Sequence, residues 1–109
     1  MKIVRVTYTT TAEYAGQNKT NISVVMNDLG QLNNPDINYH VCLGPDEKTF
    51  THTAFFRADE DQKILLELPA FKRFQEQLKA SSPEVGPKQE FLSLVGSSKD
   101  IFSPTLGTV

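Results

Sequence analysis

His52 is the residue of this sequence best placed to do chemistry. It stands in an alternating segment, residues 50–56, in which His52, Ala54 and Phe56 share one strand face. A histidine set into an apolar face could orient a ligand carbonyl or act as a base near neutral pH. The alternative is a core histidine satisfied by a tyrosine hydroxyl or a backbone group, because buried polar groups generally find partners. Both remain open, and His52 is the candidate catalytic residue.

A second pair, His40 and Cys42, lies two residues apart and therefore on one face of a strand. That spacing could bring two metal ligands together, but metal sites usually need three or four ligands, and Cys42 is the only cysteine. A Cys–His nucleophilic pair is also conceivable, but no acyl-transfer elbow or oxyanion motif accompanies it. We therefore expect no metal site here and interpret this face as a subunit interface.

Composition limits the class of protein. The chain has 109 residues, with 11 Lys and Arg scattered among 13 Asp and Glu. Nucleic-acid binding requires a basic footprint, which is not visible. No apolar run approaches the ~18 residues of a transmembrane helix, and no signal-peptide pattern is present. We expect one domain that binds neither nucleic acid nor membrane, in the cytoplasm.

The first third of the chain predicts a strand followed by a helix. Residues 3–9 alternate, with Val4, Val6 and Tyr8 on one face. Thr10 and Thr11 are N-cap candidates for the helix. Apolar residues then recur at helical spacing: Ile22, Val25, Met26, Leu29 and Leu32. The run at 33–36, Asn-Asn-Pro-Asp, predicts the end of this helix.

Residues 37–43 and 50–56 predict a β-hairpin around Gly44-Pro45-Asp46. Pairing Leu43 with Phe50 sets Val41 opposite His52 and Tyr39 opposite Ala54, so one face is apolar and aromatic with a histidine in it. The other face is too polar for a monomer core yet contains Phe55, which favours a subunit interface. It carries Asn38, His40, Cys42, Thr51, Thr53, Phe55 and Arg57.

The last part of the chain predicts two short helices and a strand. The acids at 59–61 suit a helix start rather than a cation site, and Pro69 predicts a break near Leu68 before a helix to about Lys79. Residues 89–95 read as the last strand. The order βαββαβ predicts an α+β, ferredoxin-like domain over residues 1–96, whose four-stranded antiparallel sheet carries helices on one face. Residues 97–109 are expected to form an extended arm.

Two segments, TFTH at 49–52 and LELPAFKRF at 66–74, resemble the dimeric α+β barrel superfamily, specifically the antibiotic biosynthesis monooxygenase-like proteins. Those relatives end their third strand with an aromatic residue, pass through an acidic turn and continue into a helix with a small-Pro-x-Phe-x-x-Phe signature. The resemblance covers most of the chain and includes Asn18 in the first helix and Tyr39 in the second strand.

The resemblance implies a homodimer with sheets packed face to face, and a pocket between sheet and helices for small aromatic or polyketide-like molecules. Some relatives oxidise such molecules with O₂ and no added cofactor. Phe56 stands where a Trp is typical, Ala54 where an acid is frequent, and Leu65 in place of a helical His. We accordingly expect no haem and no other cofactor.

We predict a small-molecule-binding protein with a mainly apolar pocket for an aromatic or fatty-acid-like ligand. One alternative is a cofactor-independent monooxygenase, with His52 as base or orienter and Tyr39 as hydrogen-bond donor. Another is a structural dimer with a closed core. The expected ligand-binding residues are Tyr8, Asn18, Tyr39, His52, Ala54, Phe56, Leu65 and Phe71. The expected dimer interface is the sheet face that bears Asn38, His40, Thr53 and Phe55.

Overall fold

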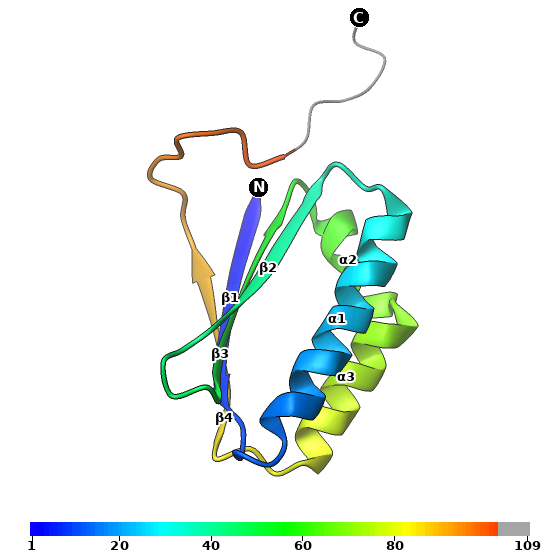
Figure 1. The fold of residues 1–109 in the computed structure, drawn as a ribbon. Helices are drawn as coiled ribbons and strands as arrows, with labels where there is room; N and C mark the ends of the chain where they lie inside the picture. The colour runs from blue at the N-terminus through cyan, green and yellow to red at the C-terminus, as the bar shows by residue number, and fades with distance from the viewer. Residues whose placement is uncertain (103–109) are drawn as a thin grey trace, which may run out of the picture.

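A computed structural model describes residues 1–102. One layer is a four-stranded antiparallel sheet, and three helices cover a single face of it (Figure 1). In chain order the elements are β1 (Lys2–Thr9), α1 (Ala15–Leu32), β2 (Ile37–Leu43), β3 (Thr49–Phe56), α2 (Asp59–Glu67), α3 (Pro69–Ala80) and β4 (Val85–Leu92). The predicted ferredoxin-like βαββαβ layout is confirmed, with its second helix divided in two.

The strand order is β2-β3-β1-β4, so β1 and β3 form the centre of the sheet. Along β2 and β3, Val41 lies opposite His52 and Tyr39 opposite Ala54, as predicted. Along β1 and β3, Val6 lies opposite His52 and Tyr8 opposite Phe50. Since directly opposed residues share a face, Tyr8, Tyr39 and His52 all point toward the helices.

Helix α1 begins later than the threonines suggested. Residues 12–14 form a turn, and the helix starts at Ala15. The hydroxyl of Thr11 accepts the backbone N–H of Tyr14 at 3.2 Å and so satisfies one donor ahead of the helix. At the other end Asn33 takes the left-handed conformation with φ 51°, a common way to stop a helix.

The break at Leu68 is confirmed. Leu68 is extended, α2 ends at Glu67, and Pro69 occupies the first position of α3, where its missing N–H costs nothing. At the start of α2 the Asp61 carboxylate accepts the backbone N–H of Ala58 at 3.0 Å and the side-chain amide of Asn34 at 3.2 Å. The acidic run therefore starts a helix, as expected.

The prediction that the last strand spans residues 89–95 is wrong. The strand spans Val85–Leu92 and pairs with β1. Polar residues and Pro87 hide it in the sequence. The register shifts between Thr7 and Thr9 of β1, which leaves Gly86 and Pro87 in the irregular stretch opposite. Proline is tolerated at a bulge on an edge strand. The bounds of β4 are therefore set by its hydrogen bonds to β1 and not by a hydrophobic pattern of its own.

The outer sheet face is mainly polar, although Ile3, Phe55 and Leu92 lie side by side on it, and it is partly covered by the chain that follows β4. Residues 93–102 form neither helix nor strand, and they run on the side of the sheet away from the helices (Figure 1). The side-chain amide of Asn38 donates to the carbonyl of Ile101 at 2.7 Å, and the Arg57 guanidinium lies 4.8 Å from the centre of the Phe102 ring. Part of the predicted arm, 103–109, lies outside the described residues.

Candidate functional site

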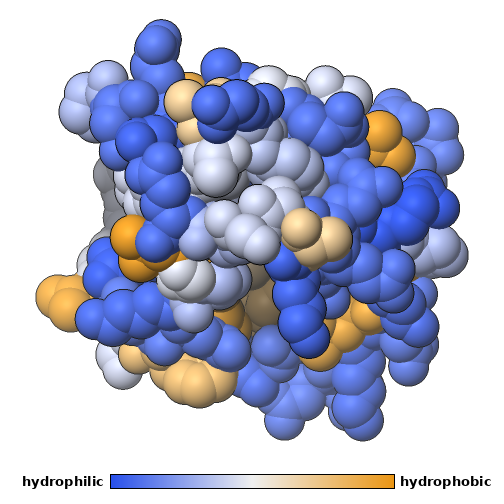
Figure 2. All heavy atoms as spheres, turned by 90° about the horizontal axis from the view of Figure 1, so that it is seen from below, coloured by the Kyte–Doolittle hydropathy of each residue, from blue (hydrophilic) through white to orange (hydrophobic). Residues whose placement is uncertain are grey.

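A cavity of about 500 Å³ lies between the sheet and the helix pair α2–α3. Its walls come from the inner faces of all four strands, from both helices and from Pro83 in the connection to β4. Seen from the α3–β4 end of the molecule, a recess with hydrophobic atoms at its floor opens among hydrophilic side chains (Figure 2). The volume is within the roughly 300–1,000 Å³ of small-molecule pockets.

Seven of the eight predicted ligand residues line this cavity: Tyr8, Tyr39, His52, Ala54, Phe56, Leu65 and Phe71. The eighth, Asn18, is fully buried beneath it, where its side-chain amide donates to the Tyr8 hydroxyl at 2.8 Å. Asn18 therefore reaches the cavity through Tyr8.

A chain of hydrogen bonds crosses the floor of the cavity. Nε2 of His52 lies 2.8 Å from the Tyr8 hydroxyl, and Nδ1 lies 2.5 Å from the Tyr39 hydroxyl. With Asn18 the chain has four members from β1, α1, β2 and β3. Phe74 packs over the imidazole with ring centres 5.4 Å apart. Two tyrosine hydroxyls thus satisfy both ring nitrogens of His52, and the ring is also part of the cavity wall.

Burial keeps these groups neutral. It lowers the pKa of His52 to about 4, because the imidazolium ion would lose its hydration. Burial also raises the pKa of Tyr8 well above its ordinary value, against the opposing effect of the Asn18 hydrogen bond. The pKa of Tyr39 is raised mainly by burial and secondarily by Tyr8. At neutral pH the floor of the cavity offers uncharged hydrogen-bonding groups.

The cavity also has wall residues that the sequence did not single out as a site. Val4, Val6, Leu66, Phe74 and Leu78 add apolar surface, and none of them was among the predicted ligand residues. Four polar side chains also line the cavity: Gln75, Lys79 and Gln89 are exposed, and Gln62 is half-buried. No local pattern identifies these four, because they come from α2, α3 and β4, which are separate segments of the sequence.

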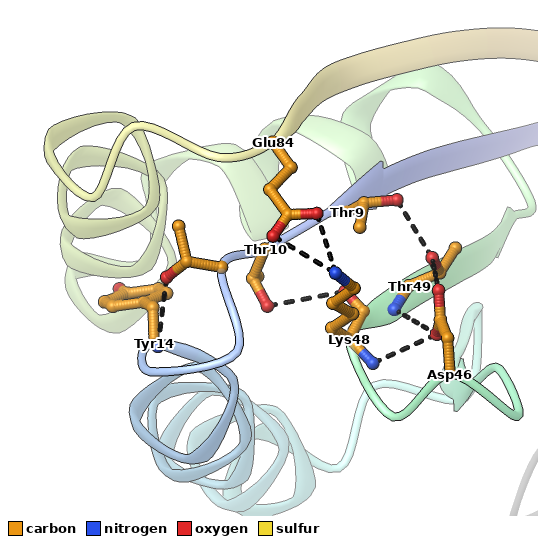
Figure 3. Close-up of polar contacts among 8 residues, drawn as sticks. Thr9, Thr10, Tyr14, Asp46, Lys48, Thr49 and Glu84 are labelled. Atoms are coloured by element: carbon orange, nitrogen blue, oxygen red, sulfur yellow. Dashed lines mark hydrogen bonds and ion pairs between the residues drawn. The ribbon is translucent and has the colours of Figure 1, made fainter.

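A polar cluster fixes the segment that leads into β4 (Figure 3). Glu84 pairs with Lys48 of the β2–β3 connection at 2.8 Å. In the same connection Asp46 accepts the backbone N–H groups of Lys48 and Thr49 and the Thr49 hydroxyl, which lowers its pKa. Pro83, which lines the cavity, directly precedes Glu84. The hairpin loop is thus attached to one end of the cavity wall.

The residues of the predicted subunit interface lie on the outer face, away from the cavity. His40 and Cys42 are exposed there, and the His40 and Phe55 rings lie 6.1 Å apart. Within residues 1–102 no group of three or more His, Cys, Asp or Glu side chains could hold a metal ion. None of the helices described is long and apolar enough to cross a membrane.

The sequence itself has no close match: no protein-family model fits it, and no curated protein is similar enough to count. Solved structures do match it. A Bacteroides thetaiotaomicron protein described as an antibiotic biosynthesis monooxygenase has a TM-score of 0.76 at 8% identity, over 91% of this chain and 93% of its own. A Deinococcus radiodurans protein with the same description has a TM-score of 0.68 at 17% identity, over 94% and 100%.

A third similar structure is a mutant form of SnoaB from Streptomyces nogalater, which is described as a cofactor-independent oxygenase. Its TM-score is 0.65 at 10% identity, over 91% of this chain and 98% of its own. Similarity at these identities establishes the fold. This chain therefore has the same ferredoxin-like fold as solved structures described as antibiotic biosynthesis monooxygenases.

Proposed function

We propose that this protein binds a small, mainly apolar molecule in the cavity between its sheet and helices α2 and α3. The observation that carries the proposal is the cavity itself, about 500 Å³ with mainly apolar walls and a floor of uncharged hydrogen-bonding groups. Apolar walls with a few placed polar groups are typical of ligand sites. A cavity of this volume is evidence against the closed-core alternative, because protein interiors normally pack without large voids.

Mass spectrometry on freshly purified protein provides the first test. Native spectra should show a ligand-bound mass, and denaturing conditions should release an apolar compound. Where the protein is purified empty, calorimetric titration with 1-naphthol and with dodecanoate compares an aromatic ligand with a fatty-acid ligand. Binding of either supports the proposal, and a protein that is purified empty and binds neither contradicts it.

A matched pair of variants localises the binding. Ala54→Leu adds a side chain to the cavity wall, so it should weaken binding about tenfold or more through lost volume. Ala80→Leu places the same change at the exposed end of α3 and should leave binding unchanged. Equal affinity in both variants would place the ligand elsewhere.

A second candidate function is a cofactor-independent monooxygenase; SnoaB, which has a similar fold, is described as a cofactor-independent oxygenase. The specific observation that favours it is a neutral imidazole held between two phenols in the cavity wall. With 1-naphthol the reaction would be C₁₀H₈O + O₂ → C₁₀H₆O₂ + H₂O. One oxygen atom enters the ring as the new carbonyl, and the other leaves as water with the two hydrogens removed.

Oxygen consumption separates catalysis from binding. Wild-type protein should consume one O₂ for each naphthoquinone formed, and His52→Ala should lose this turnover while remaining folded by circular dichroism. Unchanged turnover in His52→Ala would remove His52 from the mechanism. Binding without O₂ consumption would support the binding function and contradict the monooxygenase function.

We further propose that two chains pair through the outer sheet face that bears Asn38, His40, Thr53 and Phe55. The support is its composition: Thr53 and Phe55 are half-buried at the centre of the face, and helices cover the opposite face. The side-chain amide of Asn38 donates to the carbonyl of Ile101 in its own chain. In the proposed dimer the segment around Ile101 would therefore take part in the interface together with Asn38.

A further inference from the structure

The hydrogen-bonded chain on the cavity floor has a direction that can be worked out from its buried donors. The Tyr8 side chain is 1% exposed, and within the described residues its hydroxyl contacts only Asn18 and His52. Asn18 donates to it, so the hydroxyl hydrogen of Tyr8 has one remaining acceptor, Nε2 of His52. Any other arrangement would bury this hydrogen without a partner, which costs about 1–3 kcal/mol.

Nε2 therefore accepts, and the proton of the neutral imidazole is on Nδ1. The Nδ1–H then donates to the Tyr39 oxygen at 2.5 Å. An imidazolium ion would not fit this chain, because a second N–H would compete with the hydrogen of Tyr8, and burial holds the pKa of His52 at about 4. Apart from the second amide hydrogen of Asn18, the one hydrogen of the chain left without an acceptor among the described residues is that of the Tyr39 hydroxyl, and Tyr39 lines the cavity.

The orientation of the Asn18 amide distinguishes this direction of donation, from Asn18 through Tyr8 and His52 to Tyr39, from the reverse direction. Its Oδ1 is fully buried and, alone among the buried side-chain polar atoms described, has no hydrogen-bond partner. Turning the amide would pair Oδ1 with Tyr8 but bury both hydrogens of Nδ2 without acceptors. Orphaned buried N–H groups are rarer than under-satisfied carbonyls, so the donating orientation is favoured.

We propose that Asn18 is a positioning residue that holds His52 in the Nδ1–H tautomer and thereby makes the Tyr39 hydroxyl a hydrogen-bond donor to the ligand. This inference rests on the proposed binding function and names the ligand class. The ligand has an apolar body and an uncharged acceptor, such as a ketone or quinone carbonyl, at the Tyr39 end. The one cation among the cavity residues, Lys79, is exposed and belongs to the α3 side of the wall.

The tautomer can be measured in the ligand-free protein by nitrogen-15 NMR, which distinguishes protonated from unprotonated ring nitrogens. The chain has two histidines, and the exposed His40 serves as an internal reference that exchanges between tautomers. His52 should show protonated Nδ1 and unprotonated Nε2. A protonated Nε2 with unprotonated Nδ1 would overturn the direction.

Asn18→Asp replaces the amide donor by a carboxylate acceptor of the same size. The Tyr8 hydrogen can then go to residue 18, which leaves Nε2 free to donate to the Tyr8 oxygen, so His52 should shift toward the Nε2–H tautomer. An unchanged pure Nδ1–H tautomer in a folded Asn18→Asp protein would overturn the positioning role of Asn18. If this variant does not fold, the wild-type spectrum still decides the direction of the chain.

The ligand class is tested with two probes of one shape, 1-tetralone and tetralin, which differ by a carbonyl. Wild type should bind the ketone about tenfold more tightly, and Tyr39→Phe should abolish the preference. Equal affinity in wild type would overturn the acceptor class. Failure of both probes to bind would contradict the proposed function and the ligand class, while the tautomer is measured independently of either.

Discussion

The Tyr8 hydroxyl on β1 lies 2.8 Å from Nε2 of His52 on β3, and the two residues are diagonal neighbours on the cavity face of the sheet. Diagonal neighbours stand about 7–8 Å apart, which aromatic side chains can span. Tyr39 holds the same diagonal relation from β2, since Tyr39 lies opposite Ala54. The register of the central strands thus places the imidazole between two phenols.

Stability should fall in mildly acidic solution because of His52. The unfolded chain binds a proton near the ordinary pKa of 6.5, while the folded protein binds it only near 4. The contribution is complete above pH 6.5 and is lost as the pH falls toward 4, by about 3 kcal/mol in the free energy of unfolding. Urea unfolding at several pH values measures it.

The matched control is His52→Gln, which keeps a polar side chain and removes the titration. Carboxylates titrate in both proteins, so the difference between the two pH profiles isolates His52. Profiles that run parallel between pH 7 and 4 would show that His52 is not held neutral by burial.

The His52 environment was predictable because strand alternation and a short hairpin fix which residues share a face. The pairing of Leu43 with Phe50 is enough to place Tyr39 and His52 near each other on the same sheet face. For Asn18 the sequence predicts only which face of its helix it occupies. Its hydrogen bond to Tyr8 depends on how far α1 is rotated and displaced over the sheet, which helical spacing does not specify.

Other features of the site carry no local signal. β4 is a polar edge strand with a proline, and its bounds come from the backbone groups of β1 rather than from its own side chains. Gln89 lines the cavity because it lies on the inner face of this strand, which the sequence pattern alone does not specify. The volume of the cavity depends on the separation of α3 and β4, which is a property of packing between distant segments.

Asp61→Ala should lower the free energy of unfolding by about 1–2 kcal/mol. Asp61 is 8% exposed and accepts hydrogen bonds from Ala58 and Asn34, both of which would lose a partner. Glu60→Ala, at the exposed neighbouring position, is the control and should change little. Equal urea midpoints for the two variants would contradict the capping role.

Glu84→Gln should leave the urea midpoint unchanged, because exposed ion pairs contribute little to stability. It should nonetheless speed amide hydrogen exchange at residues 81–85, since the contact to Lys48 at 2.8 Å ties this segment to the hairpin loop. Glu76→Gln on the exposed side of α3 is the control. Unchanged exchange in Glu84→Gln would mean that the segment is held by other contacts.

Ala54→Leu should cost less than about 1 kcal/mol of stability, because the added atoms enter an existing cavity. Ala70→Leu is a sharp comparison. Ala70 is 3% exposed in the core, is not part of the cavity wall, and has no such space. Overpacking there should cost about 1–3 kcal/mol. Equal destabilisation of the two variants by urea unfolding would mean that the cavity closes in solution.

Phe55→Asp should raise the dimer dissociation constant by about thirtyfold or more, because it puts a charge at the centre of the proposed interface. Phe55 lies on the outer face beside His40, so the change leaves the cavity residues in place. Lys72→Asp, on the exposed surface of α3, introduces the same side chain in the helix layer and should leave the association unchanged. Light scattering over a dilution series measures both. If Phe55→Asp is as dimeric as Lys72→Asp, the subunit contact lies on another surface. If the wild-type protein is monomeric, the proposed dimer is wrong.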